Sequence, residues 1–206
     1  MFAWLMSWAN PQYKDNNPML NSAAVEFVQL LLNKNEDFYI NKIEVGRQWQ
    51  NIDIWAEIND DILLIIEDKV ETSEHSNQLE RYRQIAQEEY IGQNVQVFCS
   101  YIKIGNEPDA ILSKIREKGY HTIERNDILS CIGKYCSSHP LLQDYYNHLN
   151  NIEMLTQSYQ TKLMKDWDWY AWQGFYKELE KHLLEANWSY VANPAGGFLG
   201  MWWHFE

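Results

Sequence analysis

Residues 52–70 read IDIWAEINDDILLIIEDKV, and this stretch decides the fold. Apolar and polar side chains alternate from Ile52 to Ile58, which indicates a half-buried strand. Residues 59–61, Asn-Asp-Asp, predict a turn. The apolar run ILLII at 62–66 then predicts a strand that is buried on both faces, at the centre of a sheet. The two strands are therefore expected to form a hairpin.

Outward from this hairpin, helical and strand-like patterns follow one another along the chain. Upstream we expect a helix to about Leu32, capped by Asn21 or Ser22, and a strand over about 40–49. Downstream we expect a helix over about 74–90 capped by Thr72 or Ser73, a strand over 95–101, a helix over 108–118, a short strand over 121–123 and a helix from Asn126. This order predicts an α/β core over residues 1–139, with a central mixed β-sheet flanked by helices.

The residue pattern of the sequence changes after residue 140. Residues 141–162 and 169–185 predict two long amphipathic helices, and tryptophans are frequent from Trp167 onward. We expect residues 140–206 to be a helical, aromatic-rich extension packed on the core. The ending FLGMWWHF, residues 198–205, is strand-like, and its pairing partner is expected beyond this chain. This ending leaves open whether the chain is truncated at its C-terminus.

Composition limits the class of protein. With 206 residues and 46% hydrophobic residues, the chain can build one sizeable core. Its three cysteines predict no disulfide framework and suit a reducing cytoplasm. No apolar stretch approaches the roughly 20 residues that span a bilayer. The formal net charge of −12 predicts weak non-specific binding of nucleic acid, because such binding normally needs a basic surface.

Two acids and a lysine lie on the two strands of the predicted hairpin. Glu67 and Lys69 are two residues apart, so they point to the same face of their strand, and Asp53 lies on the partner strand. Two carboxylates supply hard oxygen ligands for Mg²⁺, and a lysine beside them can orient water or stabilise charge on a phosphate. Charged residues at strand ends are usually solvated surface, but the ends of buried strands are also where α/β proteins place sites.

The helix after this strand adds a second pattern. Gln78 and Tyr82 are four residues apart and share one helical face. The pattern D(53), E(67)-D-K(69) and Q(78)-L-E-R-Y(82) resembles the PD-(D/E)XK nuclease superfamily. It resembles in particular a prokaryotic branch with a Q-x-x-x-Y helix after the catalytic lysine. The opening FAWLMSWANPQY and the late GGFLGMWWHF also resemble that group, so the resemblance covers most of the chain.

The resemblance implies a role for each matching residue. Asp53 and Glu67 would hold Mg²⁺ or Mn²⁺, with the backbone carbonyl of Asp68 as a further ligand and its side chain on the opposite face. Lys69 would be the catalytic lysine. Gln78 and Tyr82 would support the site, and Gln78 would contact the substrate backbone. Independently of the resemblance, Arg81 flanks Tyr82 and is a candidate for contact with a substrate phosphate, although a solvated helix position suits it equally well. Glu26, on the first long helix, would be an additional metal ligand, although a lone helical glutamate also suits a solvated face.

Two classes of function remain open. The first is a metal-dependent nuclease that hydrolyses DNA, cytoplasmic and without contact to a membrane, in prokaryotic defence or DNA processing. The second is an inactive nuclease fold that serves as a binding module, or an effector domain that needs a protein partner or a second copy of itself. The tryptophans suit either stacking on bases or packing in a core.

Overall fold

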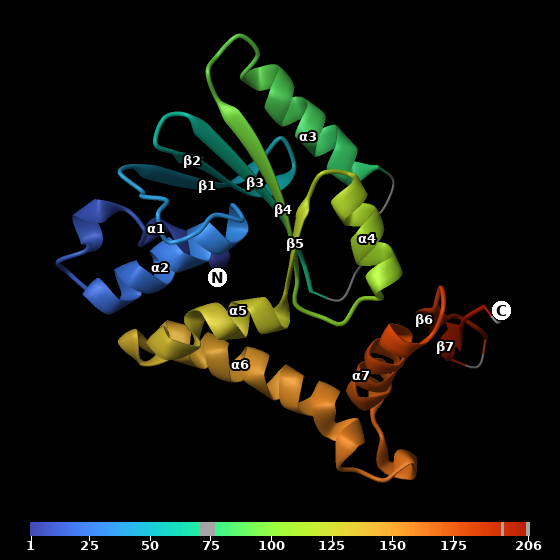
Figure 1. Ribbon diagram of the computed structural model, residues 1–206. Helices are drawn as coiled ribbons and strands as arrows, with labels where there is room; N and C mark the ends of the chain where they lie inside the picture. Colours follow the sequence, from blue (N-terminus) through green and yellow to red (C-terminus); the bar gives the residue numbers. More distant parts are fainter. Residues whose placement is uncertain (71–76, 195, 205–206) are drawn as a thin grey trace.

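The computed structural model describes residues 1–70, 77–194 and 196–204. Its centre is a five-stranded mixed sheet in the order β1-β2-β3-β4-β5 (Figure 1). The first three strands are antiparallel, and β4 and β5 continue the sheet in parallel with β3. These strands are β1 Ile43–Trp49, β2 Ile52–Ile58, β3 Ile62–Lys69, β4 Gln96–Lys103 and β5 His121–Glu124. The predicted α/β core with a mixed sheet is thus confirmed.

Helices cover both faces of this sheet (Figure 1). The helices are α1 Phe2–Ser7, α2 Pro18–Leu31, α3 Gln78–Glu89, α4 Asp109–Glu117, α5 Arg125–Ile132, α6 Pro140–Gln157 and α7 Trp169–Leu179. Short 3-10 helices, η1 to η5, span Pro11–Tyr13, Gly133–Ser138, Ser158–Gln160, Met164–Asp166 and Glu180–His182. One face packs against α1, α2, α5 and α6, and the other packs against α3 and α4.

β3 separates two hydrophobic cores. Leu64 and Ile66 belong to the core under α1 and α2, whereas Leu63 and Ile65 belong to the core under α3 and α4. The alternation follows from the period of two in a strand, and it explains why ILLII can be apolar throughout. Consequently Glu67 and Lys69 continue the α3 face, and Asp68 continues the α1 face.

Two helix starts differ from the prediction. α2 begins at Pro18, and the side chain of Asn17, rather than that of Asn21 or Ser22, caps it by accepting a hydrogen bond from the amide of Leu20 at 3.1 Å. Proline suits the first helical position, where no amide donor is needed. α5 begins at Arg125 with a capping box between Glu124 and Asp127. The predicted caps Thr72 and Ser73 lie outside the described residues.

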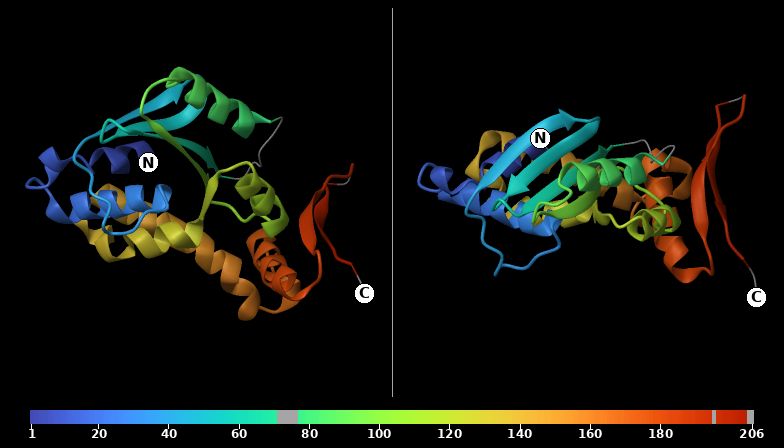
Figure 2. Two further views of the ribbon diagram at one scale, coloured as in Figure 1. Left: turned by 45° about the horizontal axis from the view of Figure 1, so that its top comes forward. Right: turned by 90° about the horizontal axis from the view of Figure 1, so that it is seen from above.

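The prediction for the C-terminal segment was wrong in one respect. β7, Phe198–Trp202, pairs antiparallel with β6, Asn187–Val191, so the strand finds its partner within the chain. The segment after residue 140 is therefore helical only as far as α7 and η5, and it ends in a hairpin beside α7 (Figure 2). α6 contributes Leu142 and Leu149 to the same core as α1 and α2. Nowhere in 1–70, 77–194 or 196–204 is a helix both long and apolar enough to cross a membrane.

Candidate active site

The hairpin of β2 and β3 brings Asp53 and Glu67 opposite each other. Its register pairs Ile54 with Ile66, and one step further along each strand lie Asp53 and Glu67. The amide nitrogen of Asp68 donates a hydrogen bond to Asp53 Oδ2 at 3.1 Å, which ties the Asp53 carboxylate to the backbone of β3. Because residues opposite each other in a sheet share a face, the two carboxylates are neighbours.

Lys69 completes this group. Its Nζ lies 2.6 Å from Glu67 Oε1. Burial lowers the pKa of Lys69, but the adjacent Glu67, Asp53 and Tyr82 raise it by more, so the net shift is upward. Lys69 is therefore an ammonium ion at neutral pH. The structure brings together Asp53, Glu67 and Lys69, as the spacing in the sequence predicts.

The Glu67 carboxylate is held in an unfavourable environment. Its residue is only 2% exposed, and burial raises its pKa, with a further contribution from the negative charge of Asp53 and an opposing one from Lys69. Within the described part of the chain, no donor forms a hydrogen bond with Glu67 Oε2. A buried carboxylate oxygen in that state costs free energy unless a further positive group meets it.

This chemistry suits a divalent cation. Two adjacent carboxylates, one of them with a buried oxygen to which no described residue donates, form a hard anionic oxygen set of the kind Mg²⁺ and Mn²⁺ prefer. No group of three or more His, Cys, Asp and Glu side chains that could bind a metal occurs among the residues described. An ion here would therefore take its remaining ligands from main-chain oxygen, water and substrate.

Asp68 points away from this group, as expected from the alternation along β3. Together with Asp53 it lines a cavity of about 380 Å³ that also contacts Met1, Trp4 and Arg47. Burial and the charge of Asp53 raise the pKa of Asp68 to about 6, against the opposing N-terminal ammonium and Lys69. The N-terminal helix, which the sequence did not suggest as part of the site, thus lies at the same cavity as Asp53 and Asp68.

α3 lies over the lysine side of the site. Gln78 Nε2 donates a hydrogen bond to the Tyr82 hydroxyl at 2.6 Å, and Tyr82 is buried close enough to Lys69 to influence its pKa. The Arg81 guanidinium is exposed and lies 5.4 Å from the centre of the Tyr82 ring. Gln78 and Tyr82 therefore contact each other at the start of α3, where Tyr82 lies near Lys69 and Arg81 faces solvent.

The structure does not bring Glu26 to these residues. Its carboxylate accepts a hydrogen bond from the Tyr135 hydroxyl and forms an ion pair with Lys134 Nζ at 2.8 Å. Both partners belong to η2, which packs against α2. The surroundings of Glu26 are those of a surface ion pair between two helical segments.

A second acid–lysine pair, which the sequence analysis missed, lies beside the first. Lys103 is the register partner of Lys69 on β4, and its Nζ is 3.5 Å from Glu107 Oε2. The Tyr101 hydroxyl donates a hydrogen bond to the same oxygen at 2.9 Å, and all three side chains are buried. A lysine directly after the apolar residues of VFCSYI was the available signal, but the predicted strand ended at Tyr101.

Comparison with known families agrees with this geometry. The family model described as the PD-(D/E)XK nuclease superfamily matches residues 1–161. The chain therefore belongs to this superfamily, whose nucleases generally use divalent metal ions. No match was found among curated proteins or among solved structures.

Proposed function

We propose that this protein is a nuclease that hydrolyses DNA phosphodiester bonds with the help of Mg²⁺ or Mn²⁺, in prokaryotic defence or DNA processing. The observation that supports it most is the convergence of Asp53, Glu67 and Lys69 at one point of the sheet, with a buried Glu67 oxygen that no described donor meets. Membership of a nuclease superfamily supports the same reaction class.

Each residue has a defined task in this proposal. Asp53, Glu67 and the main-chain carbonyl of Asp68 would hold the ion, and a bound divalent ion supplies a Lewis acid that polarises the phosphate and acidifies water. The Lys69 ammonium orients the attacking water and stabilises the negative charge that develops on the phosphate. Gln78 and Tyr82 fix the end of α3 beside Lys69, and Arg81 contacts a backbone phosphate of the substrate.

The test is a cleavage assay on single- and double-stranded DNA with Mg²⁺ or Mn²⁺. We expect cleavage that EDTA abolishes. Lys69→Ala should lower the rate by about 100-fold or more, because a charged group that stabilises a transition state contributes several kcal/mol. Lys42→Ala is the matched control, since Lys42 is an exposed lysine that forms an ion pair with the exposed Asp60. Cleavage by Lys69→Ala at the wild-type rate would contradict the assignment of this site as the active site of a nuclease.

A second candidate is an inactive nuclease fold that binds a protein partner or a second copy of itself. The net charge of −12 favours it, since an acidic surface repels DNA. The two candidates differ in ion binding. An inactive fold should show no metal site that depends on Asp53 and Glu67, whereas the nuclease should show one. We place the enzyme first because the acid pair and the lysine lie together and are largely withdrawn from solvent.

A further inference from the structure

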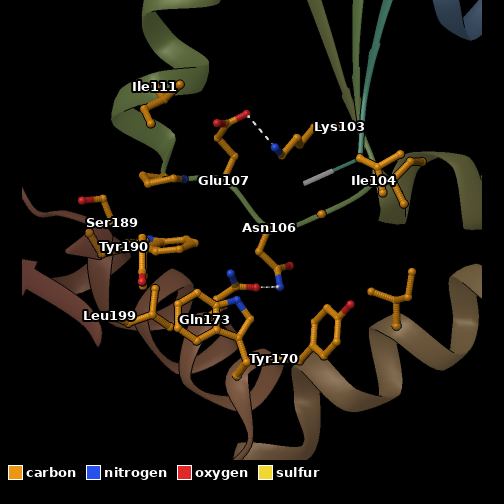
Figure 3. Close-up of a pocket in the computed structure, with 16 residues that line it drawn as sticks. Lys103, Ile104, Asn106, Glu107, Ile111, Tyr170, Gln173, Ser189, Tyr190 and Leu199 are labelled. Carbon is orange, nitrogen blue, oxygen red and sulfur yellow. Dashed lines mark hydrogen bonds and ion pairs between the residues drawn. The ribbon is translucent and has the colours of Figure 1, made fainter. Parts of the chain in front are cut away.

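A cavity of about 390 Å³ opens at the end of β3 and β4, between the start of α4, α7 and the β6–β7 hairpin (Figure 3). Lys103 and Glu107 lie along its sheet side, and Gln173 and Tyr190 lie across from them. Val70, the residue after β3, also lines it. Its volume is within the range of roughly 300–1000 Å³ of small-molecule sites. It can therefore take a group of the size of a nucleoside.

Aromatic rings form one side of this cavity. Trp188 is only 2% exposed, and its indole nitrogen donates a hydrogen bond to Glu180 Oε2 at 2.9 Å, so the ring is fixed. Trp169 and Tyr190 are 44% and 51% exposed, and their ring centres are 5.7 Å apart in an edge-to-face arrangement. Trp169 and Tyr190 therefore offer accessible flat apolar surfaces on which a planar ligand can stack, and Trp188 forms a fixed inner wall of the cavity.

The polar groups of the cavity suit a neutral ligand with donors and acceptors at its edge. Asn106 Nδ2 donates a hydrogen bond to Gln173 Oε1 at 3.0 Å, which orients the Gln173 amide and leaves its nitrogen available on the cavity side (Figure 3). Lys103 lies against Glu107, and both are buried, so their charges offset each other. The described residues that line the cavity therefore offer hydrogen-bonding groups and little net charge, which suits a base better than a phosphate.

The cavity begins next to the candidate active site. Val70, which lines it, directly follows Lys69, and Lys103 is the register partner of Lys69 in the parallel pair β3–β4. The register also pairs Glu67 with Tyr101, whose hydroxyl contacts Glu107 at the cavity. If a phosphate of a DNA strand lies at Lys69, a neighbouring nucleotide of that DNA strand is therefore within reach of the aromatic rings.

We propose that this cavity binds one nucleobase of the DNA strand being cut, unstacked from its neighbours, next to the scissile phosphate. The proposal rests on the proposed nuclease function and adds the substrate class. A base in a duplex must first lose its pairing and stacking, which costs a few kcal/mol, whereas a base in a single strand is already accessible. The enzyme therefore acts on single-stranded DNA, or at unpaired nucleotides, in preference to the interior of a duplex.

The test measures binding separately from cleavage. A short fluorescent oligodeoxyadenylate is titrated with Lys69→Ala protein in Mg²⁺, and its anisotropy gives the affinity. Adding Trp169→Ala or Tyr190→Ala should weaken binding by about 5- to 100-fold, the loss expected for one base–aromatic stack. Tyr39→Ala is the matched control, because Tyr39 is 74% exposed and lies outside this cavity; its affinity should equal that of the parent.

Three further ligands and one further variant identify what the cavity holds. A strand of the same length with abasic sites should bind more weakly than the oligodeoxyadenylate, and Tyr190→Ala should not weaken it further. A fully paired duplex should be equally insensitive to Tyr190→Ala. A single-stranded oligothymidylate should behave like the oligodeoxyadenylate, because stacking tolerates any base. Tyr190→Phe keeps the ring and should retain the affinity, even though it removes the hydrogen bond to the Gly196 carbonyl.

The proposal is overturned if the parent protein binds no single strand, if the abasic strand binds as tightly as the oligodeoxyadenylate, or if Trp169→Ala and Tyr190→Ala bind like the parent. These outcomes are independent of cleavage. Metal-dependent cleavage without any dependence of binding on the cavity rejects this inference alone. Cavity-dependent binding by a wild-type protein that cuts no DNA rejects the nuclease function alone.

Discussion

Glu67 is the residue at which stability and function are most clearly opposed. Its carboxylate is buried beside Asp53, and its raised pKa means that the folded protein disfavours the ionised form. The ionised form is the one that binds a cation. A residue that lowers stability in the absence of its ligand is typical of a functional site.

Glu67→Gln should therefore stabilise the metal-free protein. The amide is close in shape to the protonated carboxyl group, and it removes the repulsion with Asp53. We expect the free energy of unfolding at pH 7 to rise, measured by urea denaturation in EDTA. Cleavage should be lost in the same variant. A clear loss of stability would show that the ion pair with Lys69 outweighs the cost of burying the charge.

Tyr82 connects the residue scale to α3. Tyr82→Phe keeps the buried ring but removes the hydrogen bond from Gln78 Nε2. The free energy of unfolding should fall by about 0.5–1.5 kcal/mol, and the cleavage rate by about tenfold, because Gln78 loses its fixed position. Thermal denaturation and single-turnover kinetics measure the two effects. Tyr39→Phe, at an exposed tyrosine, should change neither, and an unchanged cleavage rate in Tyr82→Phe would leave Gln78 with no positioning role.

At the scale of elements, Arg125 fixes the end of the sheet that carries the cavity. Its guanidinium donates hydrogen bonds to the Ile104 carbonyl at 2.6 Å, to Asn106 Oδ1 at 3.0 Å and to Glu153 Oε2 at 2.7 Å. These bonds join the start of α5, the loop after β4 and the helix α6. Because Arg125 is buried and its partners lie on separate elements, we infer that it holds Asn106 at the cavity.

Glu153 makes this connection depend on pH. Burial alone raises the pKa of Glu153, but hydrogen bonds from Gln157 and Arg125 outweigh it and hold the pKa below its ordinary value of 4.5. A lowered folded-state pKa contributes stability above pH 4.5 that is lost as pH falls through the folded value. Glu153→Gln should cost about 1–3 kcal/mol at pH 7 and less below pH 4, measured by urea denaturation across pH. A constant difference at every pH would contradict this role.

The sequence predicted some elements well and others poorly, for physical reasons. The β2–β3 hairpin was predictable because each strand carries its own pattern, a period of two in one and ILLII in the other. The three residues of the site follow from that register. β6 was not predicted, because the five residues NWSYV carry little pattern and depend on β7 for pairing. The Lys103–Glu107 pair depends on where β4 ends and how the following loop returns, which no local pattern specifies.

Glu26 illustrates the limit for helical residues. A helical pattern indicates which face is apolar, but it does not indicate which distant segment meets a polar side chain. The partners of Glu26 come from η2, more than a hundred positions along the chain. Similarly, the approach of α1 to the cavity that contains Asp53 and Asp68 is a tertiary contact between the chain start and the hairpin.

On the scale of the whole molecule, the sheet separates two tasks. Its α1 and α2 face buries the larger core with α5 and α6, whereas its α3 face ends in the acid–lysine pairs and continues into the aromatic cavity beside α7. The net charge of −12 makes long-range attraction of DNA weak. We therefore expect recognition to depend on close contacts at the ion, at Lys69 and at the aromatic rings.

The most direct test of the central claim is a calorimetric titration of the protein with Mn²⁺. We predict a binding site for Mn²⁺ that is lost in Asp53→Asn and in Glu67→Gln but retained in Asp60→Asn, which changes an exposed aspartate paired with Lys42 on the surface. The absence of any Mn²⁺ site in the wild-type protein, or a site that all three variants retain, would contradict it.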